Sequence, residues 1–363
     1  MIERDELAAW LRLLETPQVG RESARKLLAA FGSAQAAIDA SIGARREVVG
    51  PGAAQALATL PPTLDALVQT TLGWLAADGS HAVLTLGDPL YPDALLNTAD
   101  PPLLLYLHGR AELLQAASVA IVGSRNPTPQ GTENARAFAA HLSQAGWPVV
   151  SGMALGIDGA AHEGALEGSA GTVAVVGTGL DQIYPRRHHS LSNRIVNHGL
   201  IVSEYSLGTP PLPPNFPLRN RIIAGLARGT LVVEAALQSG SLITARLASE
   251  AGREVFAIPG SIHSPQSRGC HALIKQGAKL VESAQDILEE LQPGLARMAK
   301  AREEPAAADP LLEALGYEPV SLDALGARTG WTASELNTRL LELELAGQVA
   351  RLPGQLFQRV ARG

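Results

Sequence analysis

The stretch SVAIVGSRNPTPQG, residues 118–131, decides the fold. Its first part is a near-continuous apolar run, which is typical of a strand buried on both faces of a parallel sheet. The chain then turns at Gly123, where a dinucleotide-binding turn would continue with two further glycines. Here Ser124 and Arg125 follow instead. The stretch therefore predicts a strand-to-helix turn that offers a hydroxyl and a guanidinium in place of the dinucleotide fingerprint.

Six further apolar stretches follow, and their starts are about 24–30 residues apart, which leaves room for one crossover helix each. The stretches are WPVVS, TVAVVG, LIVSEY, TLVVEA, EVFAIPG and KLV. The segment that precedes the first strand, residues 84–109, is expected to extend the same sheet. The pattern predicts an α/β fold over residues 80–291, with a doubly wound, mostly parallel sheet.

The two ends of the chain predict smaller domains. Residues 1–75 contain short helical patterns, which hint at a helix-hairpin-helix unit; they fit either a phosphate-holding hairpin or a purely structural bundle. Residues 292–308 are rich in Pro, Ala and charged residues and are predicted to be a linker. Residues 309–363 predict three helices and a hairpin, which together indicate a winged helix, and Thr332 with Glu335 forms a capping-box pattern.

Composition bounds the class of protein. The chain has 363 residues, 46% of them hydrophobic, so two or three folded domains are expected. Its one cysteine, Cys270, excludes an internal disulfide and fits a reducing compartment. The start of the chain lacks the apolar region of a signal peptide, and no apolar run reaches the length of a membrane span. We therefore expect a cytoplasmic protein with no membrane partner.

The net charge of −6 is unevenly distributed along the chain. Residues 118–280 contain 13 Lys and Arg against 9 Asp and Glu, a balance of +4. Residues 1–117 and 281–363 each contain 8 Lys and Arg against 13 Asp and Glu. A local basic surface for nucleic acid is therefore compatible with the acidic average.

Polar residues gather in the loops that follow the predicted strands. In a doubly wound sheet these loops share one edge, where ligands bind. Their chemistry suits anions: Gly123 permits close backbone approach, Ser124 can donate a hydrogen bond, and Arg125 can hold a phosphate bidentately. Ser241 is either a second phosphate ligand or a helix N-cap. Two rings, Tyr184 and Phe216, adjoin arginine pairs, which is how proteins hold single strands, although both rings could equally be core residues.

Enzyme signatures are missing from these loops. There is no phosphate-binding P-loop and no nucleophile elbow, so no catalytic residue is predicted. Asp158 and His162 are four residues apart on one predicted helix, a spacing that suits acid–base work or half a metal site. The remaining metal ligands are missing, so we expect a structural Asp–His hydrogen bond, no metal and no cofactor.

Six motifs in order resemble the DNA-processing protein A (DprA, Smf) family. They are AIVGSRNPTPQG, VVSGMALGIDGAAHEGAL, GTGLDQIYP, NFPLRNRIIAGL, VVEAALQSGSLITA and AIPGSIHSPQSRGCHALIKQGA. The resemblance implies an extended Rossmann-like domain over residues 80–291, flanked by a sterile-alpha-motif or helix-hairpin-helix domain at residues 1–75 and a winged helix at residues 309–363. It also implies a non-catalytic protein that binds and protects single-stranded DNA, forms a homodimer through the Rossmann-like domain, and loads RecA recombinase during natural transformation. The family's lysine after the YP motif is replaced by Arg186 or Arg187.

The residues expected to contact DNA lie in these loops and motifs. They are Gly123, Ser124, Arg125, Arg186, Arg187, Phe216, Arg219, Asn220, Arg221, Ser239, Gly240, Ser241, Arg268 and Lys275.

Two further interpretations concern function. A nucleotide-processing enzyme similar to phosphoribohydrolases is the alternative to a DNA-binding protein, and Glu234 would be its catalytic glutamate, although the paired glycines of that signature are missing. Residues 309–363 contain 5 Arg against 7 Asp and Glu, and the predicted recognition helix carries Glu335, Glu342 and Glu344 with only Arg339. That charge favours protein interaction over duplex binding for the winged helix.

Overall fold

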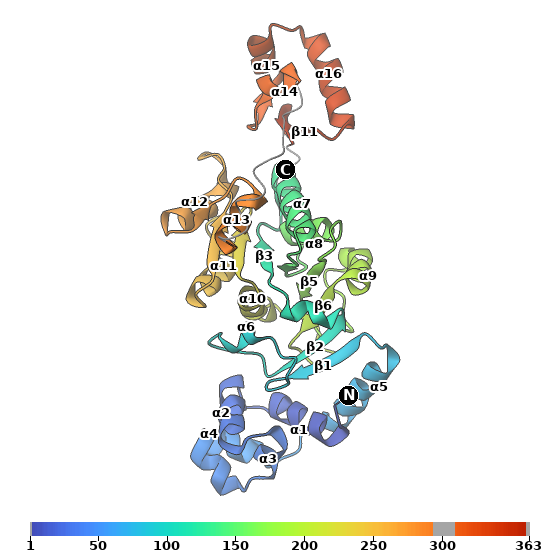
Figure 1. Ribbon diagram of the computed structural model, residues 1–363, viewed down its shortest axis with the longest axis vertical. Helices are drawn as coiled ribbons and strands as arrows, with labels where there is room; N and C mark the ends of the chain where they lie inside the picture. Colours follow the sequence, from blue (N-terminus) through green and yellow to red (C-terminus); the bar gives the residue numbers. More distant parts are fainter. Residues whose placement is uncertain (1, 293–308, 361–363) are drawn as a thin grey trace.

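The structure of the chain is a computed structural model that describes residues 2–292 and 309–360 (Figure 1). The predicted linker, residues 292–308, lies outside the described residues except for its first residue. The described residues form an N-terminal helical unit, a central α/β domain and a C-terminal unit of helices and short strands, as the sequence predicts.

The N-terminal unit consists of helices and packs against one edge of the central sheet. Its helices are α1 (Arg4–Glu15), α2 (Arg21–Phe31), α3 (Ala34–Asp39), α4 (Ile42–Ala56) and α5 (Leu64–Ala77). The helix α2 ends at Gly32, which adopts a left-handed conformation that suits glycine. Apolar side chains of these helices share one core with Leu104 and Tyr106 of the sheet. The helical unit is therefore joined to the α/β domain by a continuous apolar contact.

The α/β domain is built on nine strands. They are β1 (His81–Thr85), β2 (Leu104–Gly109), β3 (Val119–Val122), β4 (Val149–Ser151), β5 (Thr172–Val175), β6 (Leu200–Ser203), β7 (Gly229–Val232), β8 (Glu254–Ala257) and β9 (Lys279–Leu280). Their order in the sheet is β1-β2-β6-β5-β4-β3-β7-β8-β9. In this sheet order, all strands from β6 through β3 to β9 are parallel, whereas β1 and β2 add an antiparallel edge. The predicted fold class is confirmed.

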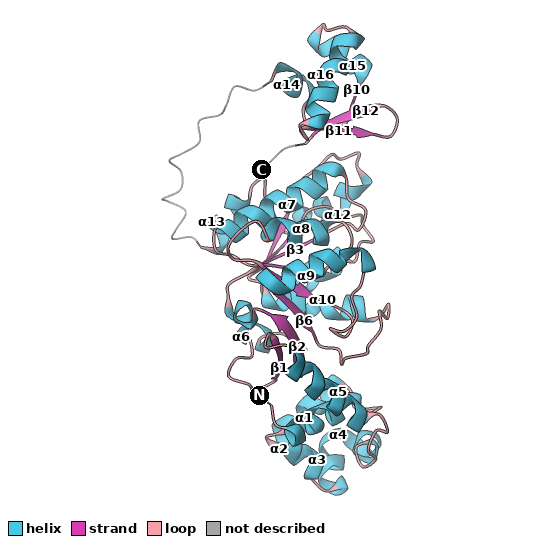
Figure 2. Cartoon of the chain, turned by 90° about the vertical axis from the view of Figure 1, so that its right-hand side faces the viewer, coloured by secondary structure: helices cyan, strands magenta, loops and turns pink. Residues whose placement is uncertain are grey.

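Helices cover both faces of this sheet (Figure 2). They are α6 (Asp93–Leu96), α7 (Pro129–Gln144), α8 (Ile157–Ala165), α9 (His189–His198), α10 (Asn215–Leu226), α11 (Ser241–Glu250), α12 (Arg268–Lys275) and α13 (Ala284–Leu291), with short 3₁₀ turns η1 (Ala111–Gln115), η2 (Arg186–His188) and η3 (Pro265–Ser267). Successive residues of a strand point to opposite faces. In β3, Val119 and Ile121 therefore pack with α7 and α8, while Ala120 and Val122 pack with α10 and α11.

The sheet order has a topological switch point between β3 and β7. The connections from β3 to β6 move along the sheet in one direction, and the chain then returns to add β7 on the other side of β3. The connections that leave the carboxyl ends of β3 and β7 run to opposite sides of the sheet, and the space between them can hold a ligand. The turn at Gly123 is thus placed at the position where a doubly wound fold binds its ligand.

The C-terminal unit matches the predicted winged helix. Its elements are α14 (Pro310–Leu315), β10 (Val320–Ser321), α15 (Leu322–Thr329), α16 (Ala333–Leu345), β11 (Val349–Leu352) and β12 (Leu356–Arg359). The three strands form an antiparallel sheet in the order β10-β12-β11. The capping box of Thr332 and Glu335 is confirmed at the start of α16. Among the described residues, no helix combines the length and apolar character that crossing a bilayer requires.

Candidate nucleic-acid interface

A pocket of about 520 Å³ lies at the switch point. Five segments supply its walls: the turn after β3, the loop after β4, the middle of α10, the loop between β7 and α11, and the segment before α12. Its principal polar lining residues are Ser124, Arg125, Asn126, Asp158, Arg219, Asn220, Gln238, Ser239, Ser241, Thr244 and Gln266. The structure therefore brings together most of the loops that the sequence assigned to one edge.

The Gly-Ser-Arg turn forms one wall of the pocket. A Cβ at Gly123 would lie 2.7 Å from Cγ1 of Ile157, so only glycine fits there. Ser124 is buried, its carbonyl accepts a hydrogen bond from the Ile157 amide at 3.1 Å, and its hydroxyl accepts one from the Asn126 amide at 3.1 Å. Arg125 is exposed and has no hydrogen bond or ion pair with any other described residue. The turn thus holds one unpaired cation at the mouth of the pocket.

The loop after β4 is fixed from below by two buried side chains. The carboxylate of Asp158 accepts hydrogen bonds from the amides of Gly152 and Ala154 at 3.1 and 3.3 Å. His162 Nε2 accepts a bond from the Met153 amide at 3.3 Å, and its Nδ1 lies 2.7 Å from the hydroxyl of Thr172. Burial raises the pKa of Asp158 and lowers the pKa of His162 to about 3, so the imidazole is neutral.

The expected direct hydrogen bond between Asp158 and His162 is therefore wrong. Each side chain instead binds separate amides of residues 152–154, since both point from α8 toward the same loop. Their structural role is as expected, because both partners hold the loop that borders the pocket.

Arg219 lies in the pocket wall, and its guanidinium is turned inward. The residue is 4% exposed, and its Nη1 donates to the carbonyls of Gly152, at 2.6 Å, and Val175. Burial lowers its pKa to about 10. The side chain thus joins α10 to the loops after β4 and β5, and its first role in this geometry is to hold the pocket in shape.

The serines after β7 form the opposite wall. The hydroxyls of Ser239 and Ser241 are 2.7 Å apart, and Ser239 also accepts a bond from the Ser241 amide at 3.3 Å. Gly240 occupies the N-cap position of α11, and Ser241 is the first residue of the helix. The N-cap interpretation of Ser241 is therefore wrong, and its hydroxyl faces the pocket at the positive end of the helix dipole.

Two aromatic rings border a second, smaller cavity of about 70 Å³ beside the pocket. The rings of Tyr184 and Phe216 are 5.4 Å apart between centroids, and Tyr184 is 47% exposed. Arg125 and Arg219 line both cavities. The polar pocket and the cavity bordered by the two rings are thus adjacent and share these two arginines.

The exposed arginines Arg186 and Arg187 lie in η2, separated from Tyr184 by Pro185 alone. Arg268 is also exposed and begins α12, immediately after the segment that supplies Gln266 to the pocket. These three residues extend the basic surface beyond the pocket. Lys275, in contrast, is the last residue of α12, which runs back toward the opposite edge of the sheet, so its side chain is not part of the pocket.

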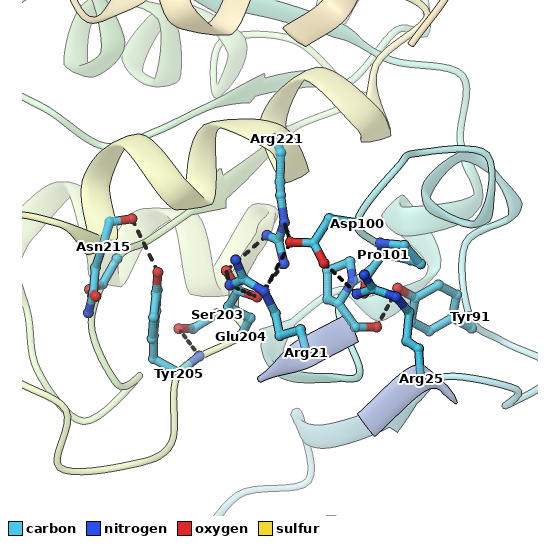
Figure 3. Close-up of polar contacts among 12 residues, drawn as sticks. Arg21, Arg25, Tyr91, Asp100, Pro101, Ser203, Glu204, Tyr205, Asn215 and Arg221 are labelled. Atoms are coloured by element: carbon cyan, nitrogen blue, oxygen red, sulfur yellow. Dashed lines mark hydrogen bonds and ion pairs between the residues drawn. The ribbon is translucent and has the colours of Figure 1, made fainter. Parts of the chain in front are cut away.

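Arg221 does not join the pocket either, although the sequence placed it beside Arg219. Its guanidinium binds Glu204 bidentately at 2.9 and 2.6 Å and Asp100 at 2.8 Å. Figure 3 shows two arginines that reach this site from α2: Arg21 binds both carboxylates, and Arg25 binds that of Asp100. The expectation that Arg221 contacts DNA directly is not supported by this placement, because the residue fastens the helical unit to α10.

The arginines and carboxylates of this cluster stabilise each other's charges. Burial opposes the charge on Arg221, but Glu204 and Asp100 outweigh it and raise the arginine's pKa. Burial likewise opposes ionisation of Asp100, but Arg221 outweighs it and lowers the pKa of the carboxyl. Each cation of this cluster is therefore already paired with a carboxylate of the protein.

Glu234, the residue on which the enzyme alternative depends, is also engaged. Its carboxylate accepts bonds from the amide and hydroxyl of Thr128, at 2.9 and 2.6 Å. Thr128 is the N-cap of α7, and a Cβ at Gly131 would lie 2.4 Å from the Glu234 carboxyl carbon. Burial raises the pKa of Glu234. The geometry gives this side chain a structural task at the start of α7.

The single arginine of α16 is paired as well. Arg339 binds Glu342 at 2.5 Å and Asp309 at 2.7 Å. Two leucines of the same helix, Leu341 and Leu345, are 52% and 82% exposed. The predicted recognition helix thus presents carboxylates and apolar side chains rather than free cations.

Some pocket residues were not selected from the sequence. They are amides and a hydroxyl: Asn126, Gln238, Thr244 and Gln266. Gln266 Nε2 donates to the Asn126 carbonyl at 3.2 Å and so links two loops that are 140 residues apart. All four lie in or next to loops that the sequence places at the carboxyl ends of the strands. That position is the only sequence feature that could have identified them.

Comparison with known protein families gives matches in three parts of the chain. Residues 82–292 match the family described as DNA recombination-mediator protein A. Residues 296–355 match the DprA winged helix domain, and residues 4–42 match the DprA-like N-terminal HHH domain. The matches therefore extend over all three units of the chain.

Individual relatives agree with these matches. Protein Smf of Escherichia coli K12 is 45% identical over 298 residues, which cover 79% of each chain. The X-ray structure of DprA from Streptococcus pneumoniae superposes with a TM-score of 0.69 at 38% identity and covers 80% of this chain and 98% of its own. A Helicobacter pylori DNA processing protein A structure, described for its single-stranded DNA binding mode, has a TM-score of 0.54 at 33% identity and covers 58% and 95%.

Proposed function

Because the chain belongs to the DNA recombination-mediator protein A family, we propose that it binds single-stranded DNA at the pocket and delivers this DNA to RecA recombinase. The observation that carries the proposal is the unpaired guanidinium of Arg125 between a hydroxyl-lined pocket and an aromatic cavity. The Helicobacter pylori relative, which is described as binding single-stranded DNA, supports the choice of ligand.

A phosphate fits the polar pocket. Arg125 supplies the charge, and the hydroxyls of Ser239 and Ser241 and the amide of Asn220 supply hydrogen-bond donors. Ser124, whose hydroxyl accepts from the protein, still has its own proton to donate. The site thus holds a phosphate through one charge and several neutral donors.

A base of the strand would stack on the rings that border the smaller cavity. Tyr184 and Phe216 offer ring faces beside the phosphate pocket, and stacking on such rings tolerates any base. Only an unpaired strand can turn a base away from its neighbours to reach them. Arg186, Arg187 and Arg268 then lie where further phosphates of the same strand would pass. This combination favours single strands over duplex.

Three further parts of the proposal rest on the family relationship. We propose a homodimer formed through the α/β domain, a role in natural transformation and recombination, and no catalytic activity. The winged helix is assigned to a protein contact, since its one arginine on α16 is paired and its exposed side chains are acidic and apolar.

A binding titration tests the ligand. Fluorescence anisotropy with a labelled oligothymidine and with a duplex of equal length, each at 50 and 200 mM salt, should show tighter binding of the single strand. The affinity for the single strand should fall with salt, with a log–log slope of about −0.7 for each phosphate contacted. Equal or tighter binding of the duplex would show that the ligand is wrong.

A second assay tests delivery. The DNA-dependent ATPase of RecA is measured on single strands covered by a single-strand-binding protein, with and without this chain. We expect the chain to shorten the lag before ATP hydrolysis. DNA binding without any effect on that lag would retain the DNA site and contradict the RecA part of the proposal.

A further inference from the structure

A cluster of metal-ligating side chains lies far from the pocket, where the helical unit meets the sheet edge. His81 of β1 and His108 of β2 face each other as cross-strand partners, and Asp78 lies three residues before His81, after the end of α5. One potential ligand atom from each of the three residues lies within 4.8 Å of the others. Backbone pairing of β1 and β2 therefore holds the two imidazoles together, with their ring centroids 4.2 Å apart.

Hydrogen bonds of the protein leave lone pairs of this cluster free. His81 Nδ1 donates to the Trp74 carbonyl at 2.6 Å, so its Nε2 carries the lone pair. Asp78 Oδ1 accepts from the amide and hydroxyl of Ser80, both at 2.8 Å. Its other oxygen, Oδ2, accepts none of these bonds. Hydrogen bonds on the side away from the potential ligand atoms thus orient the imidazole and the carboxylate, as they do for metal ligands in proteins.

His108 provides the independent sign of a ligand. Its Nε2 is inaccessible to solvent and has no hydrogen-bond partner. The nearest acidic atom, Oδ2 of Asp78, is 3.9 Å away, which exceeds hydrogen-bonding distance. A buried polar atom without a partner costs free energy, and a cation between the carboxylate and the imidazole would remove that cost.

We propose that Asp78, His81 and His108 bind one divalent transition-metal cation, with Zn²⁺ as the best fit. Two imidazoles and one carboxylate suit Zn²⁺, whereas Mg²⁺ and Ca²⁺ prefer oxygen ligands throughout. Bonds of about 2.0 Å in a tetrahedral site place neighbouring ligand atoms about 3.3 Å apart, so the three side chains, whose ligand atoms lie within 4.8 Å of one another, must move closer to bind the ion. The fourth position remains for water.

The bound cation would stabilise the joint between two units of the chain. Trp74 belongs to α5, stacks on His81 at 3.8 Å and contacts the edge of His108 at 6.5 Å between ring centroids. The ligands come from the end of α5 and from both strands of the sheet edge. A metal ion there would fasten the last helix of the helical unit to β1 and β2.

The test uses the full chain after removal of metal by a chelator. Isothermal titration with ZnCl₂ should give one ion per chain, and excess Zn²⁺ should raise the melting temperature by about 5 °C. The variants Asp78→Asn and His108→Asn should each weaken binding roughly 100-fold or more, since even outer ligand partners change metal affinity 10–100-fold. Asn at position 78 can still accept the Ser80 bonds, so it removes the charge with little effect on the turn.

The matched control is His141→Asn, which changes an exposed imidazole in the last turn of α7 and should bind Zn²⁺ as the unchanged chain does. Visible absorption of the Co²⁺-loaded chain should report a tetrahedral nitrogen and oxygen site that both cluster variants lose. No stoichiometric binding, or equal binding by Asp78→Asn and the unchanged chain, would overturn the proposal. Because Asp78 is exposed, its variant remains informative even if His108→Asn fails to fold.

Discussion

The pocket and the helix α16 differ in whether their arginines are paired with carboxylates of the protein. Both belong to modules associated with nucleic acids, and both contain arginines. In the pocket, Arg125 is exposed and has no partner among the described residues. In α16, Arg339 is held by Glu342 and Asp309. A phosphate gains most from a cation that the protein has not already neutralised, so the pairing of an arginine predicts its ligand better than the fold of its domain does.

The largest expected effect separates a buried arginine from a paired surface arginine. Replacement of Arg219 by Leu should lower the free energy of unfolding by roughly 3 kcal/mol, because the carbonyls of Gly152 and Val175 lose their buried donor. The matched change Arg339→Leu should cost no more than about 1 kcal/mol, since exposed ion pairs contribute little. Urea denaturation of both variants measures the difference. Equal stabilities would contradict the structural role of Arg219.

The next effect concerns DNA affinity. Replacement of Arg125 by Ala should weaken binding of single-stranded DNA about 10- to 100-fold, since a hydrogen-bonded charge contributes roughly 1.5–3 kcal/mol. The salt slope should become shallower by about 0.7, because one phosphate contact is lost. Anisotropy titrations at several salt concentrations measure both quantities.

The control for Arg125 is Arg110→Ala. This residue follows β2, whose carboxyl end lies at the opposite edge of the sheet from the pocket. The variant removes the same charge and should bind single strands nearly as the unchanged chain does. If both alanine variants lost affinity equally, the effect would reflect overall charge, and the pocket would not be the DNA site.

A smaller effect is expected at the aromatic cavity. Replacement of Phe216 by Leu keeps an apolar side chain against Gly177 but removes the ring face, so affinity should fall by about 1 kcal/mol. The salt slope should not change, because no phosphate contact is lost. An unchanged affinity would assign Phe216 to the core, and a changed slope would show that the substitution disturbs the neighbouring arginines.

The sequence predicted the strands and their common edge because buried strands are marked by local apolar runs. Helix geometry alone predicts that the two arginines of the RNR motif point in different directions. Residues two apart on a helix point about 200° away from each other, so Arg219 and Arg221 cannot both face one pocket. Which of them does so depends on Asp100 and Glu204, whose positions along the chain give no local signal. The partners of Asp158 and His162, in contrast, lie close in sequence, and their separate bonds depend on how the loop after β4 folds back over α8.

The smallest expected effect would make α16 more like the pocket. Replacement of Glu342 by Lys removes one carboxylate from Arg339 and adds a cation to the exposed face of the helix. Duplex affinity at low salt should rise by roughly 1 kcal/mol at most, with a salt slope steeper by about 0.9, while single-strand binding at the pocket should not change. The matched control Glu313→Lys alters charge equally on α14. An equal gain from both variants would mean that net charge, and not the freed face of α16, limits duplex binding.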